Sequence, residues 1–98
     1  MNTQADIDAV FEDAEYGIVE TGGGGEAWEN RIGNYRVLIT DLGGTRRPTV
    51  ADDILLVGIY REFDESGEPV YLEEYNTAAR AVRGAALMVA EYLAEQMA

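Results

Sequence analysis

The chain has 98 residues, 47% of them apolar, which is enough for one domain with one modest core. Its 19 acidic residues outnumber seven basic ones, all of them arginine, so the net charge is −12 with no lysine, histidine or cysteine. This composition excludes an imidazole base, a thiolate nucleophile and a disulfide scaffold, and a surface this negative repels nucleic acid and anionic lipid.

The first predicted element is an acidic N-terminal helix over about residues 3–17. Thr3 followed by Asp6 resembles a capping box, and Gly17 is the expected end of the helix. The apolar residues that recur at helical spacing are Ile7, Val10, Phe11 and Ala14.

Four consecutive glycines within residues 21–26 predict a flexible loop. A sheet is then expected over about residues 31–75. Its three strands are predicted near residues 31–40, 53–63 and 70–75, and the segment 64–69 is a hairpin connection.

The C-terminal segment predicts a helix over about residues 78–96, with Thr77 as its cap. Gly84 weakens this helix by about 1 kcal/mol unless something packs against the glycine. The apolar stripe consists of Ala78, Val82, Ala85, Val89 and either Tyr92 or Leu93.

The predicted architecture is therefore a single α+β domain over residues 1–98, ordered helix, three-stranded antiparallel sheet, helix (α-β-β-β-α), with both helices packed on the sheet. The second strand is apolar at both alternating sets of positions near its start, for example at Leu55 and Leu56. This pattern favours a sheet covered on both faces, which leaves a homodimer open.

The residues that remain for chemistry do not form a reactive set. The only serine, Ser66, lies in the predicted hairpin turn, and without lysine the glycine run cannot be a P-loop. Neighbouring carboxylates on a strand point to opposite faces. We therefore expect no enzyme activity, no catalytic residue, no cofactor and no metal. The doublet Arg46-Arg47 either contacts an acidic or phosphate group of a partner or is solvated or paired within the chain.

The charge is unevenly distributed along the chain. Residues 1–26 have seven acids and no arginine, residues 27–51 have two acids and four arginines, and residues 52–77 have eight acids and one arginine. The two acidic segments predict a charged face for a basic partner, with tyrosines of the hairpin as further contacts. The predicted partner-binding residues are Asp6, Asp8, Glu12, Asp13, Glu15, Tyr60, Glu62, Asp64, Glu65, Glu68, Tyr71, Glu73 and Glu74.

In size, acidity and simplicity the chain resembles phage-encoded anti-CRISPR and anti-restriction proteins, which mimic DNA, and the acidic immunity proteins of nuclease toxins. The resemblance implies a stoichiometric inhibitor that binds a basic, nucleic-acid-handling protein by charge complementarity, often as a dimer, in a bacterial or archaeal cytoplasm. The longest apolar run, residues 54–60, is too short to span a bilayer, so no membrane association is expected.

Two other functions fit the same composition. A small acidic adaptor or secretion-type chaperone would bind an apolar segment through the strand at residues 54–59 or through the last helix. An ordinary domain of a halophile would use its charge only to stay hydrated. The three hypotheses differ in salt dependence, because binding by charge weakens with salt, apolar binding tolerates salt, and a halophilic fold requires it.

Overall fold

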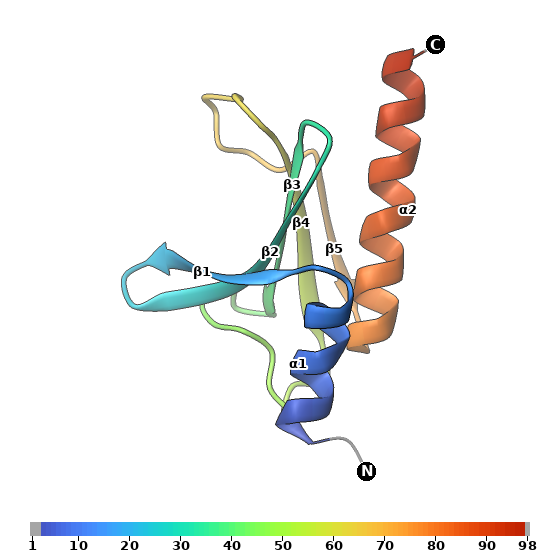
Figure 1. Ribbon diagram of the computed structural model, residues 1–98. Helices are drawn as coiled ribbons and strands as arrows, with labels where there is room; N and C mark the ends of the chain where they lie inside the picture. The colour runs from blue at the N-terminus through green and yellow to red at the C-terminus, as the bar shows by residue number, and fades with distance from the viewer. Residues whose placement is uncertain (1–2, 98) are drawn as a thin grey trace.

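The computed structural model describes residues 3–97 and contains two helices and one antiparallel sheet (Figure 1). The elements are α1 (Gln4–Asp13), β1 (Gly17–Gly22), β2 (Gly25–Ile32), β3 (Tyr35–Asp41), β4 (Leu55–Arg61), β5 (Tyr71–Tyr75) and α2 (Ala78–Met97). The strands follow one another across the sheet in chain order, each antiparallel to the next. The α+β class is confirmed, but the sheet has five strands and not the predicted three.

The start of α1 is the predicted capping box. The Thr3 amide donates to Asp6 Oδ2 at 2.9 Å, and the Asp6 amide donates to Thr3 Oγ1 at 3.2 Å. These two bonds satisfy amides that the helix itself leaves without acceptors.

The end of α1 differs from the prediction, because the helix stops at Asp13 and Gly17 already belongs to β1. Glu15 takes the left-handed conformation with φ 70°, and the Tyr16 amide donates to the Phe11 carbonyl at 2.9 Å. The rings of Phe11 and Tyr16 meet edge to face at 5.9 Å. This is a Schellman motif, and it turns the chain into the sheet without the expected glycine.

The glycine run is a hairpin turn and not the predicted flexible loop. Gly23 and Gly24 both have positive φ, 59° and 83°, as the two central residues of a type I′ turn require. They connect β1 to β2, the two strands that the sequence prediction missed. A second tight turn at Gly33, with φ 60°, separates β2 from β3, so Arg31 lies in β2 and not at the start of the predicted first strand.

The remaining predicted elements are close to their expected places. The connection between β4 and β5 runs over residues 62–70. Thr77 caps α2, since its Oγ1 accepts the Arg80 amide at 3.1 Å. Among residues 3–97, neither helix combines the length and apolar character needed to cross a membrane.

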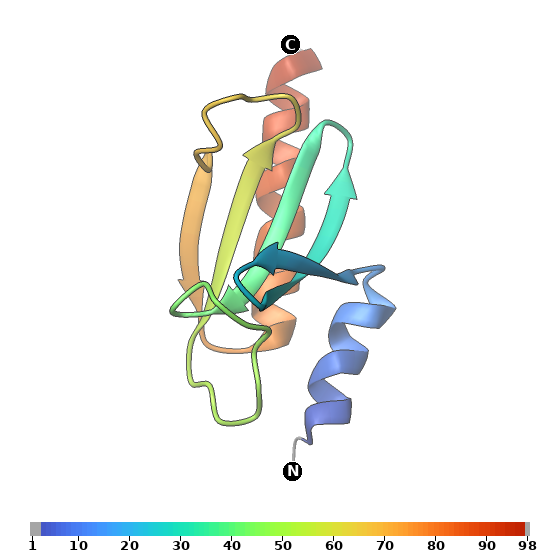
Figure 2. The same cartoon turned by 90° about the vertical axis from the view of Figure 1, so that its left-hand side faces the viewer.

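The core lies between the helices and one face of the sheet, with α2 behind the strands in Figure 2. The Phe11 ring stacks on Trp28 with centroids 5.2 Å apart, which joins α1 to β2. The largest fully buried side chains of the core are Trp28, Tyr35, Phe11, Ile39, Ile59, Val37, Val57 and Val89.

No helix covers the opposite face of the sheet, but β1 and the β3–β4 loop pass in front of part of it (Figure 2), where Thr21 and Gly44 border a hollow. Register places Leu38 beside Gly58, Leu56 beside Thr40, and Leu72 beside Gly58 on this face. Both helices pack on the other side, so neither covers this face, and its cover by a second copy of the chain stays a prediction. We call this side the open face.

Candidate protein-binding surface

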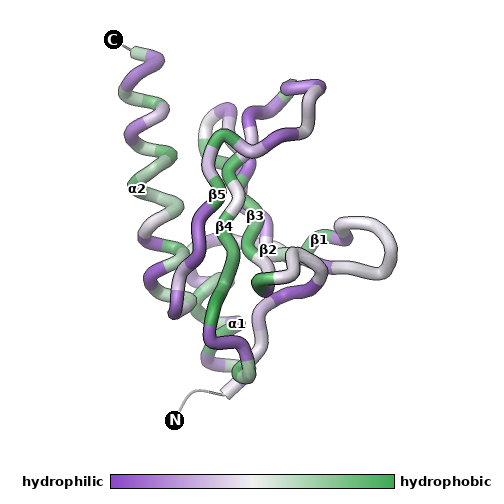
Figure 3. Tube along the Cα trace, turned by 180° about the vertical axis from the view of Figure 1, so that it is seen from behind, coloured by the Kyte–Doolittle hydropathy of each residue, from purple (hydrophilic) through white to green (hydrophobic). Residues whose placement is uncertain are grey.

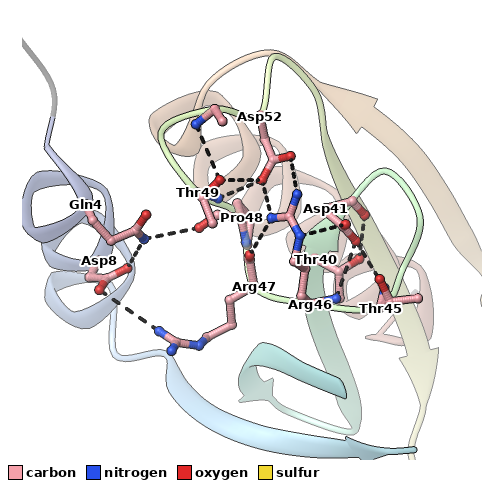
Figure 4. Close-up of polar contacts among 11 residues, drawn as sticks. Gln4, Asp8, Thr40, Asp41, Thr45, Arg46, Arg47, Pro48, Thr49 and Asp52 are labelled. Carbon is pink, nitrogen blue, oxygen red and sulfur yellow. Dashed lines mark hydrogen bonds and ion pairs between the residues drawn. The ribbon is translucent and has the colours of Figure 1, made fainter. Parts of the chain in front are cut away.

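The arginines of the middle segment are engaged within the chain, starting with Arg46 in the β3–β4 loop (Figure 4). Its guanidinium binds Asp52 through two hydrogen bonds of 2.7 and 3.0 Å, and its Nε lies 3.4 Å from Asp41 Oδ2. Asp52 also accepts the Thr49 amide at 2.7 Å. The hydrogen bond from Arg46 is the main reason that the pKa of Asp52 is lowered, so this carboxylate is ionised at neutral pH.

Arg47 connects α1 and β2 from the same loop. Its guanidinium lies 4.0 Å from Asp8 and 3.4 Å from Glu26, and it sits over the Trp28 ring at 5.5 Å from the centroid. Gln4 reinforces the contact by donating to the Pro48 carbonyl at 3.2 Å. The internal interpretation of the Arg46-Arg47 doublet is therefore the one that the structure supports.

The other two arginines of the middle segment, Arg31 and Arg36, lie at one end of the open face. Arg36 pairs with Glu29, and Arg31 lies 3.0 Å from Glu62 and 3.7 Å from Glu29. The four groups neutralise one another, so this end of the open face has little net charge.

These pairs leave an excess of unpaired carboxylates. Four of the seven arginines and six of the 19 acids take part in them, so 13 acids have no ion-pair partner among residues 3–97. The arginines of the middle segment thus pair with two acids of that segment and four acids of the two acidic segments, and the remaining acids give the surface its negative charge. The sequence alone does not predict these pairs, because they join residues up to 39 positions apart, as Asp8 and Arg47 are.

The predicted partner-binding residues of α1 are only partly available. Asp6 belongs to the capping box, and Asp8 is engaged by Gln4 and Arg47. The three that are exposed and take part in neither an ion pair nor the capping box are Glu12, Asp13 and Glu15, which we call the helix acidic group.

The predicted residues of the β4–β5 hairpin divide in the same way. Glu62 is paired with Arg31. Asp64 Oδ1 accepts the Ser66 amide at 2.9 Å, and this hydrogen bond is the main cause that lowers the pKa of Asp64. The exposed and unpaired residues Asp64, Glu65 and Glu68 form the hairpin acidic group, and Glu73 and Glu74 follow in β5.

The two acidic groups do not form one continuous face. In Figure 1 the hairpin loop and α1 lie at opposite ends of the molecule, whose longest extent is 43 Å. A single compact partner site made from both groups, as the sequence suggested, is therefore not what the fold provides.

The two predicted tyrosines lie on opposite faces of the sheet. Tyr60 is half-buried on the open face, where its ring lies close to Gly58. Tyr71 is on the face covered by α2, and its hydroxyl is 2.6 Å from that of Tyr75. Burial, followed by this hydrogen bond, raises the pKa of Tyr71. Tyr71 is thus part of the packed side of the molecule.

The open face contains an apolar strip, part of which lies in the strand at residues 54–59 that the chaperone hypothesis named as a binding surface; its other residues were not among the predicted contacts, apart from Tyr60. A hollow of about 210 Å³ lies over Leu38, Leu56, Tyr60 and Leu72, and a neighbouring one of about 370 Å³ shares Leu38 and Tyr60 and extends to Phe63. Figure 3 shows the apolar character concentrated along β4, while β5 and the adjoining loop are largely hydrophilic. The strip follows from the apolar character of both alternating sets of positions in β4, which is visible in the sequence at Leu55 and Leu56.

Phe63 is the most exposed large apolar side chain of the hairpin. It is 91% exposed, and its backbone has φ 70°, a conformation that bulky residues rarely adopt. It stands directly before the hairpin acidic group, which begins at Asp64.

Comparison with protein-family models, with curated proteins and with solved structures gives no match. Among residues 3–97 no three acidic side chains come together in the way a metal ion would require. The charges and the open face are therefore the features of the molecule that bear on its function.

Proposed function

We propose that this protein is an acidic, stoichiometric inhibitor that binds a basic, nucleic-acid-handling protein of the anti-CRISPR or DNA-mimic type. The observation that supports the proposal most strongly is the imbalance of pairing. Internal ion pairs use most of the arginines but leave 13 carboxylates free among residues 3–97. Free carboxylates on a small rigid body complement the sites that normally hold phosphates.

The mechanism is competition and requires no chemical step. A basic groove that attracts DNA phosphates also attracts ordered carboxylates, and the long-range field increases the rate of encounter. The Ser66 amide donates a hydrogen bond to Asp64 Oδ1 and holds this carboxylate in a defined position. The chain has no histidine, so its net charge changes little across the physiological pH range. Binding by charge should therefore persist across that range.

The test begins with the immobilised protein and a nuclease-treated bacterial lysate. We expect the retained proteins to be nucleic-acid-binding enzymes that duplex DNA displaces and that rising salt releases. The purified protein should then inhibit the retained enzyme on its DNA substrate, with full inhibition at equimolar amounts.

Two matched variants locate the charges that matter. The hairpin variant changes Asp64→Asn, Glu65→Gln and Glu68→Gln, and the helix variant changes Glu12→Gln, Asp13→Asn and Glu15→Gln. Each removes three carboxylates, so both lose the same net charge. The proposal requires that at least one of them weakens inhibition. The proposal is refuted if neither salt nor DNA releases the retained proteins and both variants inhibit as well as the wild type.

A second candidate function, a small acidic adaptor or secretion-type chaperone, is favoured by the apolar strip on the open face. It predicts binding of an uncharged apolar peptide with little dependence on salt. The same titration against salt therefore separates the two candidates.

A further inference from the structure

We propose that the open face and Phe63 together form the docking surface for an amphipathic, arginine- or lysine-bearing helix of the partner protein. This inference rests on the function proposed above and specifies which surface meets the partner and what kind of segment occupies it. The surface consists of Leu38, Leu56, Tyr60, Phe63 and Leu72.

The occupant must be apolar on one side. Leu72 is 53% exposed and lines the first hollow, and Phe63 is 91% exposed and lines the second. Leu38 and Tyr60 are the apolar walls that the two hollows share, and the second hollow is otherwise lined mostly by charged side chains. Exposed apolar side chains that line adjoining hollows gain free energy when a partner removes them from water.

The occupant should be a helix rather than an added strand. β3 and β4 are central strands, and their backbone groups already pair with neighbours on both sides. The open face therefore offers side chains but no free backbone hydrogen bonds, and a segment lying on it must satisfy its own amides and carbonyls. Strands are spaced about 4.8 Å apart, so the span from β3 to β5 is about 10 Å, close to the diameter of a helix.

The occupant should also be basic on its flanks. The hairpin acidic group borders the Phe63 end of the strip, and Glu74 lies on the open face opposite Leu56. Three arginines line the second hollow. Arg31 and Arg36 are neutralised by Glu62 and Glu29. The charge of Arg61 acts on Asp64, whose pKa is lowered mainly by the hydrogen bond from Ser66 and also by this arginine. A second copy of this chain fits less well, because it would bring two bodies of charge −12 together.

Phe63 is the expected anchor of the interface. An exposed ring on a left-handed backbone is unfavourable in the free protein on both counts. Burial of the ring by a partner offsets that cost, and aromatic residues in such positions are frequent hot spots.

The experiment uses the full chain labelled with ¹⁵N and two synthetic peptides of about 18 residues, or five helical turns. One peptide places leucines on one helical face and arginines on its flanks, and the other has the same composition in an order that gives no apolar face. We expect the amphipathic peptide to shift amide resonances of β3, β4, β5 and residues 62–70 and to leave those of α1 unchanged. The permuted peptide should bind about tenfold more weakly.

Phe63→Ala should weaken binding of the amphipathic peptide by about tenfold or more. The matched control is Leu87→Ala, since Leu87 is a 63% exposed apolar residue of α2 outside this surface, and it should not change the affinity. Circular dichroism of both variants verifies that they are folded.

The remaining outcomes separate the two proposals. If both peptides bind equally, in a salt-sensitive way, and shift only acidic segments, the docking surface is refuted while charge-based binding survives. If binding is strong but independent of salt, the basic character of the occupant is refuted, whereas the inhibitor function is decided by the lysate and inhibition assays described above. Light scattering without peptide tests for a dimer. If a dimer is present and Phe63→Ala dissociates it, the face binds a second copy of the chain and the proposal is overturned.

Discussion

Tyr75 occupies the space in which any side chain at position 84 of α2 would lie. A Cβ built on Gly84 would overlap the phenol ring of Tyr75, so the glycine allows β5 and α2 to approach closely. The hydroxyl of Tyr75 is in turn held by Tyr71 at 2.6 Å. The apparent weak point of the helix is thus a packing requirement of the sheet.

We therefore expect Gly84→Ala to destabilise the protein although alanine favours the helix by about 1 kcal/mol. Overpacking costs about 1–3 kcal/mol and should exceed this gain. In a Tyr75→Ala background the same substitution should become stabilising. Urea unfolding of the four proteins measures both effects, and destabilisation of equal size in the two backgrounds would contradict the interpretation.

Phe63→Gly should stabilise the free protein by about 0.5–1 kcal/mol, because glycine adopts the φ of 70° without strain. The control is Glu15→Gly, which replaces the other non-glycine residue with a positive φ among residues 3–97. Thermal unfolding should show a gain in both variants, and only Phe63→Gly should lose affinity for the amphipathic peptide. A loss of stability in Phe63→Gly would mean that the exposed ring supports the fold.

The pair between Asp52 and Arg46 should make stability depend on acid pH. The folded-state pKa of Asp52 is lowered, so its contribution is present above its unfolded pKa of about 3.9 and is lost as the pH falls through the folded-state value. Asp52→Asn should thus unfold at lower urea than the wild type at pH 7, and the difference should shrink below about pH 4. A difference that stays constant with pH would assign the effect to contacts that do not depend on the ionisation of Asp52.

Phe11→Ala should cost about 3–5 kcal/mol, since the ring is fully buried and stacks on Trp28. Trp28→Phe should cost less, because Trp28 Nε1 is buried without a hydrogen-bond partner among residues 3–97, so its removal breaks no bond. Guanidinium unfolding followed by circular dichroism compares the two. A larger loss in Trp28→Phe would indicate that the indole nitrogen is bonded in solution.

The protein should fold cooperatively at low salt. Its core and its seven ion-pair contacts are those of an ordinary domain, and salt only screens the repulsion among the free carboxylates. We expect molar salt to raise the melting temperature by about 5–10 °C. A chain that is unfolded at low salt and recovers in molar salt would support the halophile hypothesis.

Much of the local structure could be predicted from the sequence. The capping box at Thr3 and Asp6, the hairpin over residues 62–70 and α2 behind Thr77 depend on contacts between residues close in the chain. β1 and β2 were missed because Gly23 and Gly24 were interpreted as flexibility. The same two residues are also what a type I′ turn requires when the strands on its two sides, β1 and β2, pair with each other.

The candidate site was less predictable. Asp8 and Glu62 were expected to face a partner, but they pair with Arg47 and Arg31. Phe63 was treated as the end of a strand, although it is exposed beyond it. Each of these differences arises from contacts or exposure that only the folded chain defines.

By itself the sequence determined the charge, the missing reactive side chains, the α+β class and the helices, since composition and local periodicity do not depend on distant contacts. The tertiary structure decided which carboxylates remain free, which face of the sheet is open and where the two acidic groups lie. Those properties follow from strand register and from ion pairs between residues far apart in the chain. Such contacts form only when the chain folds.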